Sequence, residues 1–353
     1  MVPRPSAMLP YLTAKIAGVR GVLRARPEDF RVEEIPAYLP SGEGEHVYLT
    51  VEKTGTTTKR AAELLARALG ADPRDVGWAG MKDRHAVTVQ TLSFARVDPA
   101  AAERVEVEGV RVLSVARHRN KLRVGHLHGN RFVLRLTEVS DPEALARCEA
   151  IAAELRASGA PNYYGEQRFG REGDNAARGR QWLKGEARPP RDHFERRMLA
   201  SSVQSELFNA VLARRVSDGA LTRYLDGDLA VRHPTGGPWA VDPAEAQGLY
   251  DSHAASPTGP MFGAAMKAPT GAVAAIEGDV LAASGLSLDD LARAGDLAQG
   301  ARRALRVLVD DLTVEPDGEG ALRFAFTLPA GGYATVVLRE FRKTDDEPEA
   351  DAG

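Results

Sequence analysis

Alternation of apolar and polar residues, the pattern of half-buried strands, occurs mainly toward the two ends of this 353-residue chain. The strands that it predicts lie at residues 30–35, 47–53, 87–97, 111–116, 122–127, 132–136, 305–314 and 322–328. A lone pair of terminal strands is marginal in water, so we expect the last strands to join the sheet that the first ones form. The pattern therefore indicates one β-rich domain whose sequence is interrupted.

The interruption is helix-like and loop-rich, with many Gly and Pro residues. We predict a discontinuous domain made of residues 1–158 and 304–344, an insertion domain at 159–303, and a disordered acidic tail at 345–353. Predicted helices cover residues 58–69, 141–158 and 197–215, with Thr58 and Asp141 as the expected caps of the first two. Residues 333–341 fit a strand or a helix equally well.

The composition indicates a soluble, cytoplasmic protein. Cys148 is the single cysteine, so no internal disulfide can form, which suits a reducing compartment. No run of about 20 apolar residues is present, so we expect no membrane span. The first ten residues lack the basic and apolar regions of a signal peptide.

Basic residues cluster although the net charge is −3. Of the 46 basic residues only eight are lysine, and a guanidinium suits phosphate because it donates two parallel hydrogen bonds. Residues 111–126 contain five bases and no acid. Seven arginines lie between residues 171 and 197, namely Arg171, Arg178, Arg180, Arg188, Arg191, Arg196 and Arg197. This second cluster is a candidate phosphate track, whereas a codon bias is the alternative explanation of the arginine excess.

The segment 79–86 (AGMKDRHA) places Asp83 between two bases, directly before a predicted strand. A carboxylate held among cations stays ionised, and it can attack a sugar carbon or remove a proton from one. The alternative is a solvated turn of mixed charges, because such tripeptides are common.

Three further segments each allow a binding role and a structural one. In 161–170 (PNYYGEQRFG), tyrosines can stack on unpaired bases while Arg168 contacts phosphate, or the segment is a packed interdomain loop. In 129–132 (GNRF), Asn130 can hydrogen-bond a ring edge, or it belongs to a hairpin turn that leads Phe132 into the core. In 329–335 (PAGGYAT), a glycine turn delivers Tyr333 or marks an element boundary.

Motifs for cofactors are missing from the sequence. It contains no GxxxxGK[ST] loop and no GxGxxG after a predicted strand, so we expect no nucleotide cofactor. His126 and His128 have no cysteine or carboxylate at metal-ligand spacing, so we expect no metal site.

Seven segments, in this order, resemble the TruD-type tRNA pseudouridine synthases. They are 27–34 (PEDFRVEE), 42–46 (GEGEH), 79–90, 129–132, 161–170, 205–209 (SELFN) and 328–340. The resemblance spans about residues 27 to 341. It implies an α+β fold, in which a pseudouridine synthase core with a mixed, mainly antiparallel sheet flanked by helices bears a helix-rich insertion.

The resemblance also implies roles for individual residues. The catalytic aspartate falls on Asp83 and its basic partner on Arg24, where relatives often have lysine. The uridine pocket falls on Phe30, Asn130 and Tyr333. We further assign Phe132 and Arg168 to substrate binding.

The reaction that the resemblance implies is the isomerisation of a uridine in tRNA, expected at position 13 in the D arm, to pseudouridine. The uridine leaves its stack, and Asp83 is nucleophile or base. The expected partner is tRNA, with no cofactor, no metal and no membrane, and a monomer is favoured. The alternatives are an RNA-binding module without catalysis and a carboxylate glycoside hydrolase, in which Glu33, Glu34 or Glu45 would be the second acid.

Overall fold

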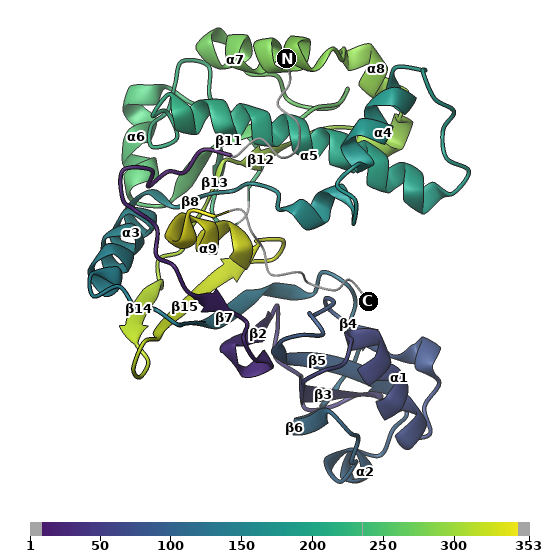
Figure 1. Ribbon diagram of the computed structural model, residues 1–353. Coiled ribbons are helices and arrows are strands. Elements are labelled where there is room, and N and C mark those ends of the chain that lie inside the picture. The colour runs from purple at the N-terminus through teal and green to yellow at the C-terminus, as the bar shows by residue number, and fades with distance from the viewer. Residues whose placement is uncertain (1–8, 235, 345–353) are drawn as a thin grey trace. The chain divides into compact units, whose positions relative to one another are not determined.

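The computed structural model describes residues 9–234 and 236–344, and the predicted acidic tail at 345–353 lies outside them. Contacts divide the chain into two units, which Figure 1 shows with their elements labelled. We call them the sheet unit (Gly18–Ala152 and Val309–Ala334) and the helical unit (Ala153–Leu308 with residues 9–17 and 335–344). The predicted domain boundaries stay a prediction.

The sheet unit contains a nine-stranded sheet within the described residues, in the order β14-β15-β7-β2-β5-β3-β6, with β1 paired to β7 and β4 to β5. The strands are β1 Val22–Leu23, β2 Phe30–Pro36, β3 His46–Lys53, β4 Gly77–Trp78, β5 Val87–Ala95, β6 Val110–His118, β7 Leu127–Thr137, β14 Thr313–Pro316 and β15 Leu322–Pro329. β2 and β5 are parallel, whereas β7 pairs antiparallel with both β2 and β15. The mixed, mainly antiparallel sheet of the predicted α+β fold is confirmed.

The two ends of the chain share this sheet, as the alternation predicts. β15 pairs with β7 from Leu322 opposite Leu136 to Pro329 opposite Gly129. The inward-facing residues Phe324, Phe326 and Leu328 of β15 are almost fully buried. Burial of these apolar side chains therefore fixes the C-terminal strands against a strand nearly 200 residues earlier in the sequence.

The strand predicted at residues 122–127 is wrong. Leu122 is buried but Val124 is 77% exposed, so the apolar positions do not face one side. Gly125 has φ +92° and its N–H donates to the carbonyl of Ala79 at 2.8 Å, which makes the segment a turn. The hairpin turn considered for Asn130 is also wrong, because β7 continues through this residue.

The remaining ambiguous segments are resolved by the structure. Residues 305–314 form two short strands, β13 (Arg306–Val307) and β14, rather than one. β13 pairs with β8 (Ala160–Pro161) in the helical unit, whereas β14 pairs with β15 in the sheet unit. Residues 334–342 form the helix α9 (Ala334–Arg342).

One face of the β3–β5–β6 part of the sheet packs against α1 (Thr58–Ala68), with the short helix α2 (Pro99–Glu103) beside it. Val47, Leu49 and Val51 of β3 are fully buried in this cluster. The cap of α1 is Thr57, whose side chain accepts a hydrogen bond from the N–H of Arg60, and not Thr58 as predicted. The Thr58 hydroxyl is therefore available for another contact.

The helical unit is built around the long helix α5 (His193–Ser217), and a smaller sheet has the order β10-β9-β11-β12. Its other helices are α4 Asn175–Leu183, α6 Pro243–Asp251, α7 Gly271–Ser284 and α8 Leu288–Ala292. Its remaining strands are β9 Leu229–Arg232, β10 Trp239–Ala240, β11 Ala255–Met261 and β12 Ala301–Ala304. The helix α3 (Ala144–Ser158) extends from the sheet unit into the helical unit.

The helix α9 belongs by its contacts to the helical unit, although we predicted residues 304–344 as part of the discontinuous domain. The fully buried carboxylate of Glu340 accepts hydrogen bonds from the backbone N–H of Leu12 and from the N–H and hydroxyl of Thr13. These charge-assisted bonds tie α9 to the N-terminal segment of the same unit. In the part of the chain that the structure describes, no helix is long and apolar enough to cross a membrane.

Candidate active site

Asp83 lies in the loop between β4 and β5 of the sheet unit, and its side chain is 27% exposed. One carboxylate oxygen accepts a hydrogen bond from the backbone N–H of His85 at 2.9 Å. The other lies 3.2 Å from a guanidinium nitrogen of Arg24, whose side chain is 15% exposed. A carboxylate held in this way keeps a fixed direction and remains accessible to a ligand.

Arg24, which follows β1, is positioned by two contacts. Its guanidinium lies over the ring of Phe30, 3.9 Å from the ring centroid, and its second contact is Asp83. The backbone of Arg24 has φ +58°, a left-handed conformation that non-glycine residues rarely adopt. The aromatic and ionic contacts hold the side chain despite this strain.

A buried ion pair anchors the residue before Asp83. The Lys82 ammonium lies 2.8 Å from a carboxylate oxygen of Glu34, and these side chains are 5% and 1% exposed. The other oxygen of Glu34 accepts a hydrogen bond from the N–H of Thr91. Because its side chain is buried, Lys82 is not part of a solvated turn. Its charge is paired with Glu34, since burial of either charge without the other would be costly.

The backbone of this loop is held by α1 as well. The N–H of Lys82 donates to the hydroxyl of Thr58 at 2.9 Å, and that hydroxyl donates to the side-chain oxygen of Gln90 at 2.8 Å. Thr58 and Gln90 are both almost fully buried. These contacts connect the Asp83 loop to α1 and to β5.

Lys53 is a functional candidate that the sequence analysis missed. Its ammonium donates to the main-chain carbonyl of Asp83 at 2.9 Å and to that of Thr56 at 2.8 Å, and the residue is 1% exposed. Burial lowers the pKa of Lys53 from 10.5 to about 8, an effect that the nearby Asp83 opposes. Its position in the sequence could have indicated this burial, because Lys53 continues the inward-facing series Val47, Leu49 and Val51 of β3.

We expect the stability difference between wild-type protein and Lys53→Met to depend on pH. A lysine with a lowered pKa binds fewer protons in the folded state than in the unfolded state between about pH 8 and pH 10.5. The wild type should therefore gain free energy of unfolding relative to Lys53→Met as the pH rises through this interval. Urea unfolding of both proteins at several pH values measures the difference.

The matched control is Lys59→Met, which removes an exposed lysine from α1. Its stability difference from the wild type should stay constant over the same pH interval. A constant difference for Lys53→Met as well would contradict the lowered pKa.

Asn130 lies on β7 between Glu34 of β2 and Leu328 of β15. Its side-chain oxygen is buried and has no hydrogen-bond partner among the described residues. A buried acceptor without a donor is destabilising unless a ligand or water supplies one. Asn130 is therefore suited to accept a hydrogen bond from a bound ring N–H.

The aromatic candidates form a chain of contacts beside Asn130. Phe132, two residues further along β7, faces the same side of the sheet as Asn130. Its ring meets that of Phe30 edge to face at 6.4 Å and stacks with that of Phe326 at 5.5 Å. Phe30 and Phe132 are 3% and 7% exposed, so they offer little surface for stacking on a ligand.

The other two predicted site residues have different settings. Tyr333 is half-buried and lies in the sheet unit, after Gly331 and directly before α9. Arg168 lies in the helical unit on the short 3₁₀ segment Glu166–Phe169. Its Nε donates to the Ser205 hydroxyl at 3.1 Å and its guanidinium is 5.3 Å from the centroid of the Tyr164 ring.

The structure thus brings together Asp83, Arg24, Phe30 and Phe132 through direct contacts, with Asn130 on the same strand as Phe132. Within residues 9–234 and 236–344, no group of three or more His, Cys, Asp or Glu side chains is placed to hold a metal ion.

Residues 7–189 and 193–341 match the protein family described as tRNA pseudouridine synthase D (TruD). The chain is 48% identical over 353 residues to tRNA pseudouridine synthase D of Anaeromyxobacter dehalogenans, covering 97% of this chain and 99% of that relative. It is 43% identical over 338 residues to a protein of the same name from Thermus thermophilus, covering 95% and 92%.

A crystal structure of a protein described as a putative tRNA pseudouridine synthase D from Methanosarcina mazei superposes with a TM-score of 0.83. The identity is 24%, and the match covers 97% of this chain and 98% of the other, so it shows the shared fold. With the family match over nearly its whole length, the chain belongs to the tRNA pseudouridine synthase D (TruD) family. This confirms the resemblance that the seven sequence segments indicated.

Proposed function

We propose that this chain isomerises a uridine of tRNA to pseudouridine, with Asp83 as the reacting side chain. The observation that supports this most directly is the accessible Asp83 carboxylate, paired with Arg24 on a loop anchored by buried groups. A carboxylate with a fixed direction is what attack at a sugar carbon, or proton removal beside it, requires.

The chemistry is a rearrangement within one nucleoside. The N1–C1′ bond breaks, the uracil turns, and a C5–C1′ bond forms. C5 loses one proton and N1 gains one, so the atoms balance and no co-reactant is consumed. Asp83 either bonds to C1′ as a nucleophile or removes the proton at C2′, and Arg24 favours its charged form in both cases.

The uridine must leave its stack, because C1′ and the far edge of the ring are not accessible within a helix. In this proposal Asn130 accepts a hydrogen bond from the uracil N3–H, which would satisfy its buried oxygen. Phe30 and Phe132 form the apolar wall, and Tyr333 stacks on the base. Exclusion of water by these rings would prevent hydrolysis while the uracil is free.

The proposal has four further parts. Arg168 contacts the RNA from the helical unit, and the protein acts as a monomer in the cytoplasm. The expected target is the uridine at position 13 of tRNA.

Incubation with an unmodified tRNA transcript, followed by carbodiimide treatment and primer extension, tests the function. A primer-extension stop at one uridine indicates that this uridine has become pseudouridine. Strand cleavage at an abasic site would instead indicate glycoside hydrolysis, and binding with neither product would indicate an RNA-binding module.

We expect Tyr333→Ala to reduce pseudouridine formation about tenfold, because stacking on a base contributes roughly 1–3 kcal/mol. Tyr333→Phe keeps the ring and should retain most of the rate. Single-turnover kinetics measure the effect, and circular dichroism reports folding. If Tyr333→Ala is unfolded, the ring belongs to the core and not to the pocket.

A further inference from the structure

Five of the seven arginines between residues 171 and 197 fall into two groups. Arg178 forms an ion pair with Glu195, and Arg180 forms one with Glu206 of α5. Both cations are therefore already paired within the protein.

The second group lies at the connection between α4 and α5. Arg188, Arg191 and Arg197 are exposed, and their side chains make no hydrogen bond or ion pair with any residue that the structure describes. An exposed guanidinium without a carboxylate partner retains its full attraction for an anion. These three residues therefore form an unpaired basic surface.

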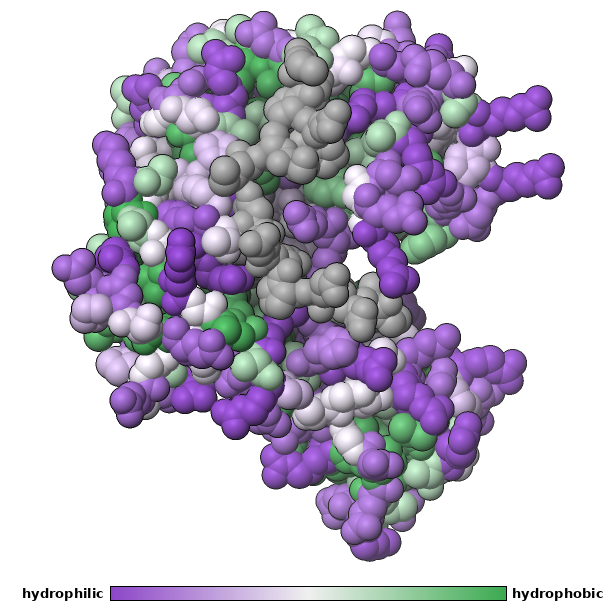
Figure 2. Space-filling model, in the orientation of Figure 1, coloured by the Kyte–Doolittle hydropathy of each residue, from purple (hydrophilic) through white to green (hydrophobic). Residues whose placement is uncertain are grey.

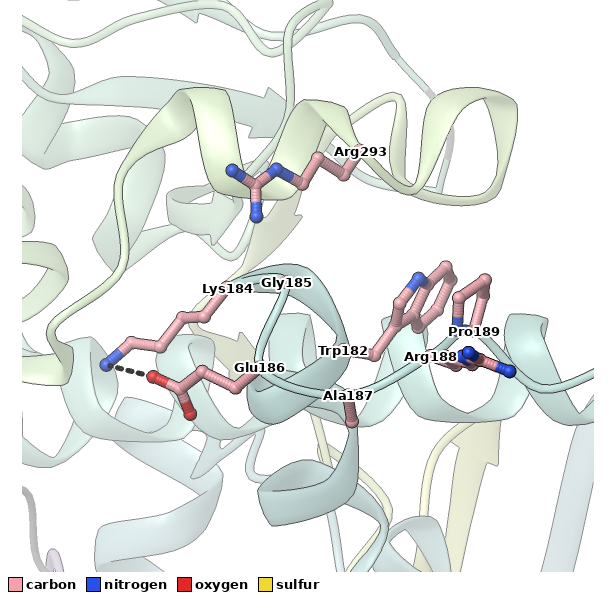
Figure 3. A pocket seen from close by; sticks show the side chains of 8 residues that line it. All are labelled: Trp182, Lys184, Gly185, Glu186, Ala187, Arg188, Pro189 and Arg293. Carbon is pink, nitrogen blue, oxygen red and sulfur yellow. Dashed lines mark ion pairs between the residues drawn. The ribbon is translucent and has the colours of Figure 1, made fainter.

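A cavity of about 650 Å³ adjoins this connection. Figure 3 shows the side chains that line it, among them Arg293, which follows α8 and donates to the carbonyl of Leu183 at 2.9 Å. Its lining contains Lys184, Arg188 and Arg293. Lys184 lies 4.0 Å from Glu186 and Arg293 lies 3.9 Å from Asp290, so Arg188 is the lining cation without an ion pair among the described residues. The lining also includes Trp182, so the cavity is basic with an aromatic wall.

Phe194 is the third feature of this region. It lies in the first turn of α5 and is 69% exposed, although contact of a large apolar side chain with water is unfavourable. Arg197 is three residues further along the helix, so the two side chains are neighbours on one helix face. An exposed ring among arginines is the combination that single-stranded nucleic acids bind.

We propose that Arg188, Arg191, Phe194 and Arg197, the connection surface, bind a segment of the RNA substrate outside the reacting uridine. Phosphates contact the arginines, and an unpaired base stacks on Phe194. Figure 2 shows hydrophilic side chains projecting from the end of the helical unit where Figure 1 places this connection. The inference rests on the proposed activity on tRNA, and it concerns binding and not the chemical step.

The charge test compares Arg191→Ser/Arg197→Ser with Arg214→Ser/Arg223→Ser. The control pair removes the same charge at the far end of α5, where Arg214 pairs with Asp218 at 2.7 Å and Arg223 is exposed. Binding of an unmodified tRNA transcript is measured over a salt series, with Asp83→Asn in every protein to prevent turnover. We expect the dissociation constant of the first pair to rise about tenfold. The slope of log K against log salt should become shallower by about 1.4, or about 0.7 per phosphate contact.

The stacking test compares Phe194→Ala with Leu113→Ala, which removes an exposed apolar side chain from β6 of the sheet unit. We expect Phe194→Ala to weaken binding of the transcript about tenfold with an unchanged salt slope, because stacking involves no ion release. Leu113→Ala should bind like the wild type.

The outcomes separate this inference from the proposed function. Equal binding by the test pair and its control overturns the inference, as does failure of the parent protein to bind the transcript. The same connection-surface substitutions made without Asp83→Asn also overturn it if the protein binds normally but has a slower single-turnover rate at saturating enzyme. A wild type that binds the transcript but forms no pseudouridine contradicts the proposed function alone.

Discussion

Asp83→Asn is expected to lower the rate of pseudouridine formation more than about a thousandfold. The dissociation constant of the tRNA should stay within about twofold of the wild-type value. The amide is nearly isosteric, so it can keep the hydrogen bond from the N–H of His85. It can neither bond to C1′ as the carboxylate would nor accept a proton at neutral pH. Single-turnover assays and a binding titration with the same tRNA transcript measure the two quantities.

The control for this substitution is Asp98→Asn, which makes the same charge change at the cap of α2 in the sheet unit. Asparagine caps helices about as well as aspartate, so its activity and stability should remain near wild type. Measurable turnover by Asp83→Asn would mean that the Asp83 carboxylate is not the reacting group.

Arg24→Gln is expected to slow pseudouridine formation about a hundredfold, whereas Arg24→Lys should stay within about tenfold of the wild type. Loss of the cation removes the charged partner 3.2 Å from the Asp83 carboxylate, and lysine restores a positive charge there. The rate constant at saturating enzyme should change much more than the dissociation constant of the tRNA.

The comparison of the two Arg24 variants separates charge from packing. Both variants lose the Arg24 guanidinium, which in the wild type lies 3.9 Å from the centroid of the Phe30 ring. Equal rates for Arg24→Gln and Arg24→Lys would mean that packing on Phe30, and not the charge beside Asp83, explains the effect. Thermal unfolding of both variants controls for a loss of fold.

Strand alternation predicted most of the sheet, and its failures have local causes. Residues 122–127 alternate as a strand does, but Val124 is exposed and Gly125 turns the chain toward Ala79. Conversely, Asn130 resembles a turn residue, yet β7 passes through it because strands on both sides pair with its backbone. Whether a short segment has neighbours to pair with depends on residues far away in the sequence.

In the candidate site, too, some residues could be predicted from the sequence and others could not. The sequence motifs and their resemblance to a family indicated Asp83, Arg24 and Asn130. They did not indicate Lys53, Glu34 or Thr58 as residues that hold the Asp83 loop. These residues contact the loop from β3, β2 and α1, and only the pairing of these elements places their side chains beside it.

Short-range periodicity in the sequence by itself indicated most strands of the sheet and the helices at residues 58–69, 141–158 and 197–215. The motifs, including the one around Asp83, indicated the family, and the resemblance to that family implied the α+β class. Only the tertiary structure decided that the Lys53 ammonium is buried against the Asp83 carbonyl. It also decided that Arg178 and Arg180 are paired, whereas Arg188, Arg191 and Arg197 have no ion-pair partner in the described part of the chain. The physical reason is that burial and charge neutralisation depend on groups brought together by folding, and neither can be read from a residue and its sequence neighbours.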